Sequence, residues 1–352
     1  MKAGFNPDML TLARESCAMT QGALAGTIGV SQSKIAKFEA GLLSVPPRNM
    51  RGLCDALKVP EDFFFQTDRV YGQGSPCMYN RRRQSASVRE VRVVHAKINI
   101  IRMQIARLMQ GMSIESENAL HRMDIDEFDG NAGEIAKLLR ISWRLPLGPI
   151  KNLVSVIEEA GGIVLRCDFD TTKIDAISQW VPGFAPIFFI NARTPGDRVR
   201  FTLAHEVGHL VMHALPNKDQ ERQADTFASA FLMPGDEIKP EYRKPVKLET
   251  LAGMKLRWRV SIQALAVRAK ALGVIDERRY RSLFTQISRL GWRKSEPVDI
   301  SIEEPTILPE ILEAQMRGNG CSVQELSSRV NAREDQFRSV YFPARSIVRL
   351  AR

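Results

Sequence analysis

The sequence predicts a mainly α-helical protein, with an all-α domain at the N-terminus and one small α+β domain further along the chain. Three observations predict this architecture. Apolar residues recur at helical spacing in several segments, capping residues and glycines mark a helical hairpin near residue 30, and short strand-like apolar runs occupy one region. A chain of 352 residues is long enough for two or three domains with cores of their own.

The N-terminal domain is predicted from a helix, a tight turn and a second helix between residues 20 and 41. Thr20 and Ser31 are good helix N-caps, so they mark where the two helices begin. Gly29 can take the left-handed conformation that the turn needs, and Gly41 ends the second helix. The residues expected to face inward are Leu24, Ala25, Ile28, Ile35 and Phe38.

The outward face of the second helix is polar and basic. Its residues are Gln32, Ser33, Lys34 and Lys37, which suit base edges and phosphates in a DNA groove. The segment from about 5 to 65 resembles the XRE (Cro/repressor-like) helix-turn-helix family, and this resemblance implies a double-stranded DNA operator as partner. The alternative is a helical hairpin with no DNA-binding role.

A linker and an amphipathic helix are expected next, over 67–112. Tyr71 to Pro76 has linker composition, and Arg81 to Arg83 is interpreted as a solvated charge run, with contact to the DNA backbone as the alternative. An apolar seam then repeats at intervals of three and four residues: Val91, Val94, Ile98, Ile101, Ile105 and Leu108. It could pair with a second copy in a homodimer or pack on the chain's own second domain.

The α+β domain is predicted from strand candidates at 163–167, 176–180 and 186–190, preceded by helices at 134–139 and 149–160. These strands would form a small sheet beside the next helix. The edge of that sheet could align an extended peptide.

That next helix carries the strongest chemical signal in the chain. Three of the five histidines fall within nine residues, and two of them belong to an HExxH motif. His205 and His209 are four residues apart, so both imidazoles leave one helical face, as two ligands of a tetrahedral zinc ion would. Glu206 could hold and deprotonate a water molecule. The alternative is a core helix whose histidines are ordinary polar residues.

A catalytic zinc site needs a third protein ligand. The metzincin pattern is excluded, because Met212 and Leu215 stand where it requires Gly and His. Glu221, on the following helix, is the preferred third ligand. His213 is the alternative, although ligands at i, i+4 and i+8 of one straight helix converge poorly.

Two further residues are expected around the ligands. Asp225 could accept a hydrogen bond from a ligand imidazole, and His213 would either support a ligand from behind or lie at the rim if Glu221 binds the metal. Ala224 and Ala228 form a small-residue strip that lets this helix approach its neighbour closely. Zinc is the expected ion, but nitrogen and oxygen ligands also accept manganese or another divalent ion.

The residues from Asp197 to His213, followed by those from Glu221 to Pro234, resemble the ImmA/IrrE metallopeptidase family. The resemblance runs from about 131 to 297. It implies His205, His209 and Glu221 as metal ligands, Glu206 as general base, and cleavage of helix-turn-helix repressors as the activity. Members of the family often have Asn where this chain has Asp225.

The net charge of +10 is concentrated in one segment. Residues 239–294 hold 15 Lys and Arg against four acidic residues. Within this segment, 248–272 reads as another helix-turn-helix, with four basic residues expected to face outward: Arg257, Arg259, Arg268 and Lys270. Such a surface could contact nucleic acid, including a single-stranded DNA effector. The alternative is a helical subdomain that covers the peptidase.

Composition favours a cytoplasmic location. Five scattered cysteines match no zinc spacing and suit a reducing compartment. No run of eighteen apolar residues and no signal-peptide pattern occur, so no membrane partner is expected.

The sequence therefore predicts a DNA-binding regulator fused to a zinc endopeptidase that cuts a repressor, either itself or a separate protein, in response to stress or a ligand. The alternative is a transcription factor whose peptidase-like domain is an inactive sensing or dimerisation module. The predicted boundaries are a helix-turn-helix domain at 1–66, the linker and helix at 67–112, a peptidase core at 113–238, the basic subdomain at 239–294 and an uncertain unit at 295–352.

Overall fold

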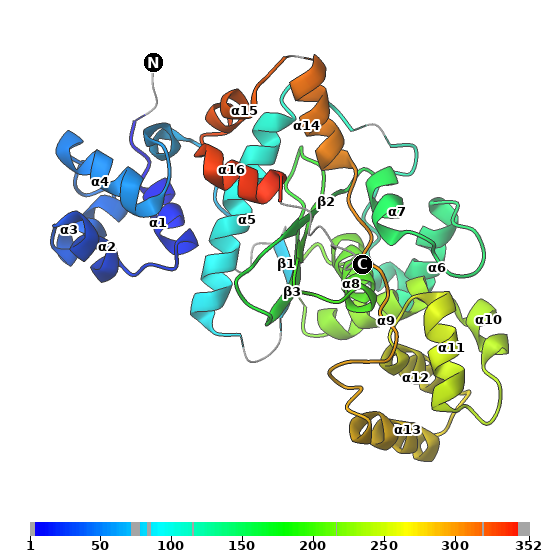
Figure 1. The fold of residues 1–352 in the computed structure, drawn as a ribbon. Helices are drawn as coiled ribbons and strands as arrows, with labels where there is room; N and C mark the ends of the chain where they lie inside the picture. The colour runs from blue at the N-terminus through cyan, green and yellow to red at the C-terminus, as the bar shows by residue number, and fades with distance from the viewer. Residues whose placement is uncertain are drawn as a thin grey trace, which may run out of the picture. The chain divides into compact units, whose positions relative to one another are not determined.

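The structure is a computed structural model that describes residues 4–71, 78–82, 86–114, 116–215, 217–318 and 320–343, with the backbone alone at 78–82. The chain forms two compact units (Figure 1). The first combines residues up to 73 with 85–113 and the segment from 308 onward, and the second contains 74–84 and 114–307. The predicted fold class is confirmed, since helices dominate and a small sheet is confined to the second unit.

In the described residues of the first unit, all regular elements are helices. Its elements are α1 (Pro7–Ser16), α2 (Gln21–Ile28), α3 (Gln32–Glu39), α4 (Pro47–Leu57), the 3-10 helix η1 (Glu61–Phe65), α5 (Val88–Leu108), α14 (Ile307–Gly318), α15 (Val323–Arg329) and α16 (Glu334–Tyr341). The predicted helix boundaries of the N-terminal hairpin are confirmed. Thr20 and Ser31 cap α2 and α3 through their side chains, and Gly29 has φ 70°.

The long helix α5 belongs to the first unit. It packs against α1, and its Ala96 and Met103 enter the same core as Ile35 and Phe38. Gln104 accepts a hydrogen bond from the hydroxyl of Tyr341 at 3.0 Å, which ties α5 to α16. All six residues of the predicted apolar seam are buried.

The second unit contains a four-stranded sheet with the order β1-β3-β4-β2. Its strands are β1 (Met78–Arg82), β2 (Ile163–Cys167), β3 (Ile174–Gln179) and β4 (Ile187–Asn191). β3 pairs antiparallel with both β1 and β4, and β4 pairs parallel with β2. The three predicted strands are confirmed to within two residues.

β1 was not expected from the sequence. Arg81 and Arg82, interpreted as part of a solvated charge run, are strand residues. Apolar alternation does not reveal this strand, because backbone pairing with β3 is what holds it in the sheet. Arg83 and all but the first residue of the predicted linker lie outside the described residues.

The other described elements of the second unit are helices. They are η2 (Ile125–Phe128), α6 (Ala132–Ser142), α7 (Leu153–Glu159), α8 (Gly196–Met212), α9 (Gln220–Leu232), α10 (Gly235–Ile238), η3 (Lys239–Glu241), α11 (Leu248–Trp258), α12 (Ile262–Ala271) and α13 (Glu277–Arg289). The α7 helix starts later than predicted, because Asn152 caps it by accepting a hydrogen bond from the amide of Ser155. Among the described helices, none has the length and apolar character needed to cross a membrane.

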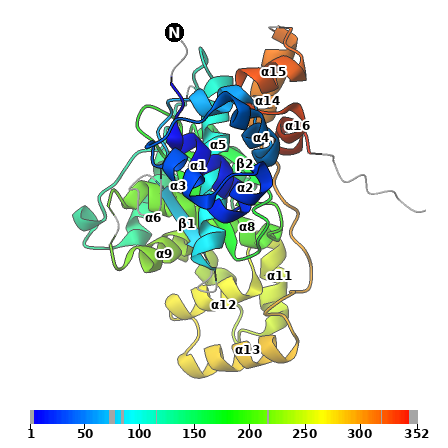
Figure 2. The same ribbon diagram turned by 90° about the vertical axis from the view of Figure 1, so that its left-hand side faces the viewer.

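The basic segment at 239–294 shares the core of the second unit. Trp258 and Leu265 belong to the same hydrophobic cluster as Val207 and Phe227, and α11, α12 and α13 lie together at one end of this unit (Figure 2). This arrangement agrees with the alternative that the segment forms a helical cover on the peptidase.

Two of the four basic side chains predicted to face outward do not. Arg268 is half-buried and donates to the carbonyl of Met233, and Arg259 donates to the carbonyl of Lys151. Carbonyl groups at the ends of neighbouring elements need donors, and these guanidinium groups supply them. The other two, Arg257 and Lys270, are more exposed and pair with acidic side chains at 2.9 Å and 2.6 Å.

Candidate metal centre

The helix α8 runs through the core of the second unit and contacts β1, β3 and β4. Its apolar residues Leu203, Val207 and Leu210 are buried. His205 and His209 lie on the same helix and are only 1% and 0% exposed. Because the chain buries both imidazoles, each needs a specific partner for its ring nitrogens.

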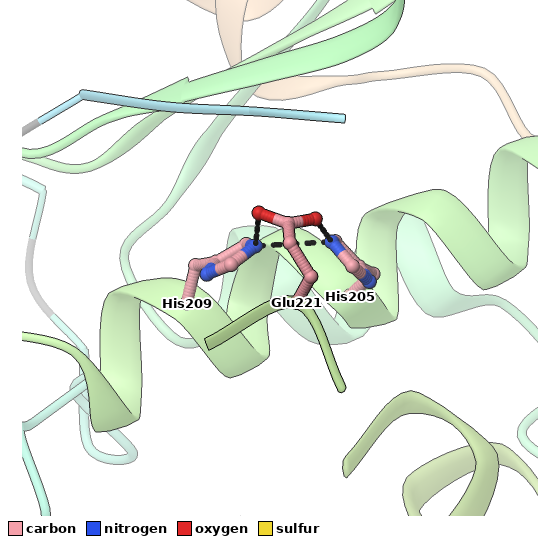
Figure 3. Close-up of side chains that lie close together, drawn as sticks. All are labelled: His205, His209 and Glu221. Carbon is pink, nitrogen blue, oxygen red and sulfur yellow. Dashed lines mark hydrogen bonds and ion pairs between the residues drawn. The ribbon is translucent and has the colours of Figure 1, made fainter. Parts of the chain in front are cut away.

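The two histidines converge with Glu221, which α9 supplies from across the helix pair (Figure 3). The Nε2 atoms of His205 and His209 are 3.0 Å apart. The two oxygens of the Glu221 carboxylate each approach one of these nitrogens: Oε2 lies 3.5 Å from His205, and Oε1 lies 3.5 Å from His209. Among the described residues, this is the one group of three or more His, Cys, Asp or Glu with ligand atoms close enough to share an ion.

The donor set fits a zinc ion. Two nitrogens bound to a tetrahedral zinc ion are about 3.3 Å apart, given zinc–nitrogen bonds of about 2.0–2.1 Å. The observed separation of 3.0 Å is close to that value. The Glu221 side chain is 60% exposed, so the group is buried on its histidine side and reachable on its carboxylate side.

The far ring nitrogens of both histidines have partners that set their tautomers. The Nδ1 atom of His205 lies 2.9 Å from an oxygen of Asp225, which can only accept when ionised. A proton on Nδ1 directs the Nε2 lone pair of His205 toward the group centre. The structure thus brings Asp225 to the position that the sequence suggested.

The His209 ring is oriented by two hydrogen bonds in series. Its Nδ1 atom lies 3.0 Å from Nδ1 of His213, and Nε2 of His213 lies 3.1 Å from the side-chain oxygen of Gln223. With a proton on Nδ1, His209 donates to His213, which in turn donates to Gln223. Burial lowers the pKa of His213, although the Gln223 hydrogen bond and the Glu221 charge oppose this shift. A neutral imidazole at this position can accept the bond from His209.

Glu206 lies on the sheet side of α8 and is fully buried. Its Oε2 atom accepts a hydrogen bond of 2.6 Å from the hydroxyl of Ser178, near the end of β3. Ser178 and Gln223 are the two polar contacts that the sequence analysis missed. A serine within a buried apolar strand was the available signal for the first, but nothing in the sequence linked it to Glu206.

Close packing between α8 and α9 brings Glu221 to the histidines. Ala224 and Ala228 are fully buried, as expected for a small-residue strip. A side chain at Gly208 would stand 2.9 Å from a ring carbon of Phe227, so only glycine fits at this crossing.

The four residues predicted to contact DNA are all exposed on α3: Gln32, Ser33, Lys34 and Lys37. Behind them, Glu39 accepts hydrogen bonds from Arg14 and Gln21, which joins α3 to the two preceding helices. The polar surface of α3 is therefore carried on a rigid three-helix support.

Comparison with known families assigns both parts of the chain. Residues 157–270 match the IrrE N-terminal-like domain, whose family is classed as a peptidase, and residues 8–62 match a helix-turn-helix domain. The chain thus carries a helix-turn-helix domain followed by an IrrE N-terminal-like domain. No curated protein matches the chain.

Both resemblances predicted from the sequence are thereby confirmed. The IrrE-like domain has a metallopeptidase-like fold and extends past residue 238, so it includes α11 and nearly all of α12. The helix-turn-helix domain is a module for binding double-stranded DNA. The chain therefore has the domain organisation of a regulator with a peptidase-like domain.

Proposed function

We propose that this regulator is a zinc-dependent endopeptidase that cuts a helix-turn-helix repressor, either itself or a separate protein, in response to stress or a ligand. The observation that carries the proposal is the convergence of His205, His209 and Glu221 on one point, with a buried carboxylate, Glu206, on the same helix. Zinc is the proposed ion, and manganese is the main competitor for such a donor set.

His205 and His209 would hold the ion through Nε2, and Glu221 would hold it through its carboxylate. A bound zinc ion would supply a Lewis acid that polarises a peptide carbonyl and makes water more acidic. The hydrogen bond of 2.9 Å to Asp225 keeps the His205 ring in one orientation, and His213 does the same for His209. Such bonds also raise the basicity of the ligand nitrogens.

Glu206 is proposed as the general base. It would take a proton from the attacking water and later give it to the leaving amine. The Ser178 hydroxyl, which donates to Oε2, fixes the rotation of this carboxylate. Glu206 is fully buried, so its carboxylate is shielded from bulk solvent.

The first test is metal content, measured by elemental analysis of the purified full chain. We expect about one zinc per chain in the wild type, and much less in His205→Ala and Glu221→Gln. His121→Ala is the matched control, since His121 is exposed and outside the group. A wild type that takes up no zinc when zinc is offered would leave the peptidase-like domain as a sensing or dimerisation module.

The second test is cleavage of labelled β-casein, with the intact mass of the chain recorded alongside to detect self-cleavage. Glu206→Gln should retain the metal but lose turnover by about 10²–10⁴-fold. Unchanged turnover in this variant would falsify the general-base role.

A further inference from the structure

The sheet edge beside the metal group is already occupied by a strand of the same chain. Without β1, β3 would be the edge strand, because the order is β1-β3-β4-β2. β1 pairs antiparallel along the length of β3, from Met78 opposite Gln179 to Arg82 opposite Ile174, with one irregularity between Arg81 and Arg82.

This pairing takes place next to the proposed reaction centre. Tyr79 lies opposite Ser178, the residue whose hydroxyl donates to Glu206. The helix α8 contacts β1 as well as β3. In Figure 3 the light-blue strand that crosses the view of His205, His209 and Glu221 is β1.

β1 comes from outside the matched domain. The IrrE-like match begins at residue 157 and contains β2, β3 and β4, whereas β1 is supplied by residues that follow the helix-turn-helix domain. An exposed strand edge recruits extended peptides through main-chain hydrogen bonds. The matched domain alone would thus present the β3 edge to such a peptide.

We propose that β1 is an internal inhibitor, which holds the β3 edge until an extended substrate peptide displaces it. This inference rests on the proposed function, because it identifies how that site is closed and what conformation its substrate adopts. A strand tethered at both ends competes at a high effective concentration, so a free peptide binds poorly while β1 is paired.

The packing of the first unit favours an inhibitor over a substrate. The chain before β1 contains α1, and the element after β1 is α5. These two helices pack together, and Ala96 and Met103 of α5 lie in the core formed with α1. A cut within β1 would leave these helices held together. Withdrawal of β1 opens the edge without any covalent change.

The test is peptide binding by the full-length chain carrying Glu206→Gln, so that no cleavage is needed. The probe is a fluorescein-labelled peptide with the sequence of residues 76–84 and Cys77→Ser, measured by fluorescence anisotropy. Tyr79→Pro with Asn80→Pro should unpair β1, since neighbouring residues of a strand donate to opposite sides and proline cannot donate. We expect this variant to bind the probe at least about tenfold more tightly than the Glu206→Gln chain in which Tyr79 and Asn80 are unchanged.

Tyr79→Ala with Asn80→Ala is the matched control, because it keeps both backbone donors and should bind as weakly as the parent. Hydrogen exchange gives a second readout: the amides of 174–179 that face β1 should lose protection in the proline variant and regain it when the probe is added, whereas those that face β4 should stay protected. Equal probe affinity in the proline and alanine variants, or unchanged protection of the amides that face β1, would overturn the proposal. A cut within 78–82 in the zinc-loaded wild type would also overturn it, because β1 would then be a substrate.

Casein cleavage separates this inference from the proposed function. If both hold, the proline variant with Glu206 intact cuts casein faster than the wild type. If the probe binds as expected and neither protein cuts casein, β1 still covers a peptide-binding edge, but the peptidase function fails.

Discussion

At the scale of single residues, the metal group depends on groups that touch no ion themselves. His205 and His209 would be interchangeable as ligands, but each is oriented by a different partner. Asp225 accepts directly from His205, whereas His209 acts through His213 to Gln223. A carboxylate contact to an imidazole is charge-assisted and stronger than a contact between neutral groups.

We therefore expect Asp225→Ala to weaken zinc binding about 10–100-fold while leaving the three ligands in place. The measurement is competitive titration against a chelator of known affinity. Asp219→Ala is the control, since Asp219 precedes the same helix and pairs with Arg222 at 3.2 Å. Equal losses in the two variants would mean that Asp225 acts through general charge and not through His205.

At the scale of elements, one helix pair carries the exposed polar face of α3 and another carries the candidate metal ligands, and each pair depends on a glycine. Gly29 has φ 70° and turns the chain between α2 and α3. Gly208 lies inside α8, where its missing side chain admits the ring of Phe227 from α9. The first glycine is needed for its backbone conformation and the second for space.

Gly208→Val should lower both thermal stability and zinc content. The added side chain forces α9 away, and overpacking of this kind costs about 1–3 kcal/mol. Gly253→Ala is the matched control in α11, because a side chain there meets nothing within 4 Å. The control should gain up to about 1 kcal/mol from helix propensity. The measurements are thermal unfolding and elemental analysis, and a Gly208 variant with normal zinc content would contradict the packing argument.

The exposed polar face of α3 gives a prediction of its own. Lys34→Ala and Lys37→Ala should each weaken binding to a mixed-sequence duplex and reduce the salt dependence of that binding by about one ion. Fluorescence anisotropy over a range of salt concentrations measures both effects. Lys58→Ala is the control, since Lys58 is exposed at the end of α4. If the salt dependence of DNA binding changes only in the Lys58→Ala control, the DNA binds to another face.

At the scale of the whole molecule, residues 296–306 form a segment without regular structure that connects several helices of the second unit. Glu296 accepts from Lys255 and from the first amide of α12. Glu303 accepts from the amides of Leu153 and Val154 at the start of α7. The segment thus supplies acceptors to helix ends that lack partners in their own helices.

We expect Glu303 to contribute more to stability than its neighbour Glu304, because Glu303 also pairs with the buried guanidinium of Arg200. Glu303→Gln should lower the free energy of unfolding by about 3 kcal/mol, since it leaves a buried charge without its counter-ion. Glu304→Gln is the adjacent control. Glu304 is 72% exposed and pairs with Arg166 at 3.0 Å, so its loss should stay below about 1 kcal/mol. Denaturant unfolding measures both, and equal effects would refute the distinction.

The sequence by itself determined the features that depend on spacing along the chain. The caps of α2 and α3, the turn at Gly29, three of the four strands and the shared face of His205 and His209 are local properties, and local geometry dictates them. The choice of Glu221 over His213 as the third member of the group also came from helix geometry, and the structure places Glu221 there.

The tertiary structure alone decided which distant groups became partners. Ser178 lies 28 residues from Glu206, and β1 lies about 100 residues before the strand that it pairs with. Arg259 and Arg268 looked like surface charges but donate to backbone carbonyls that packing brought to them. Such partnerships depend on which polar groups remain unsatisfied after the core has formed, and no periodic pattern in the sequence encodes that requirement.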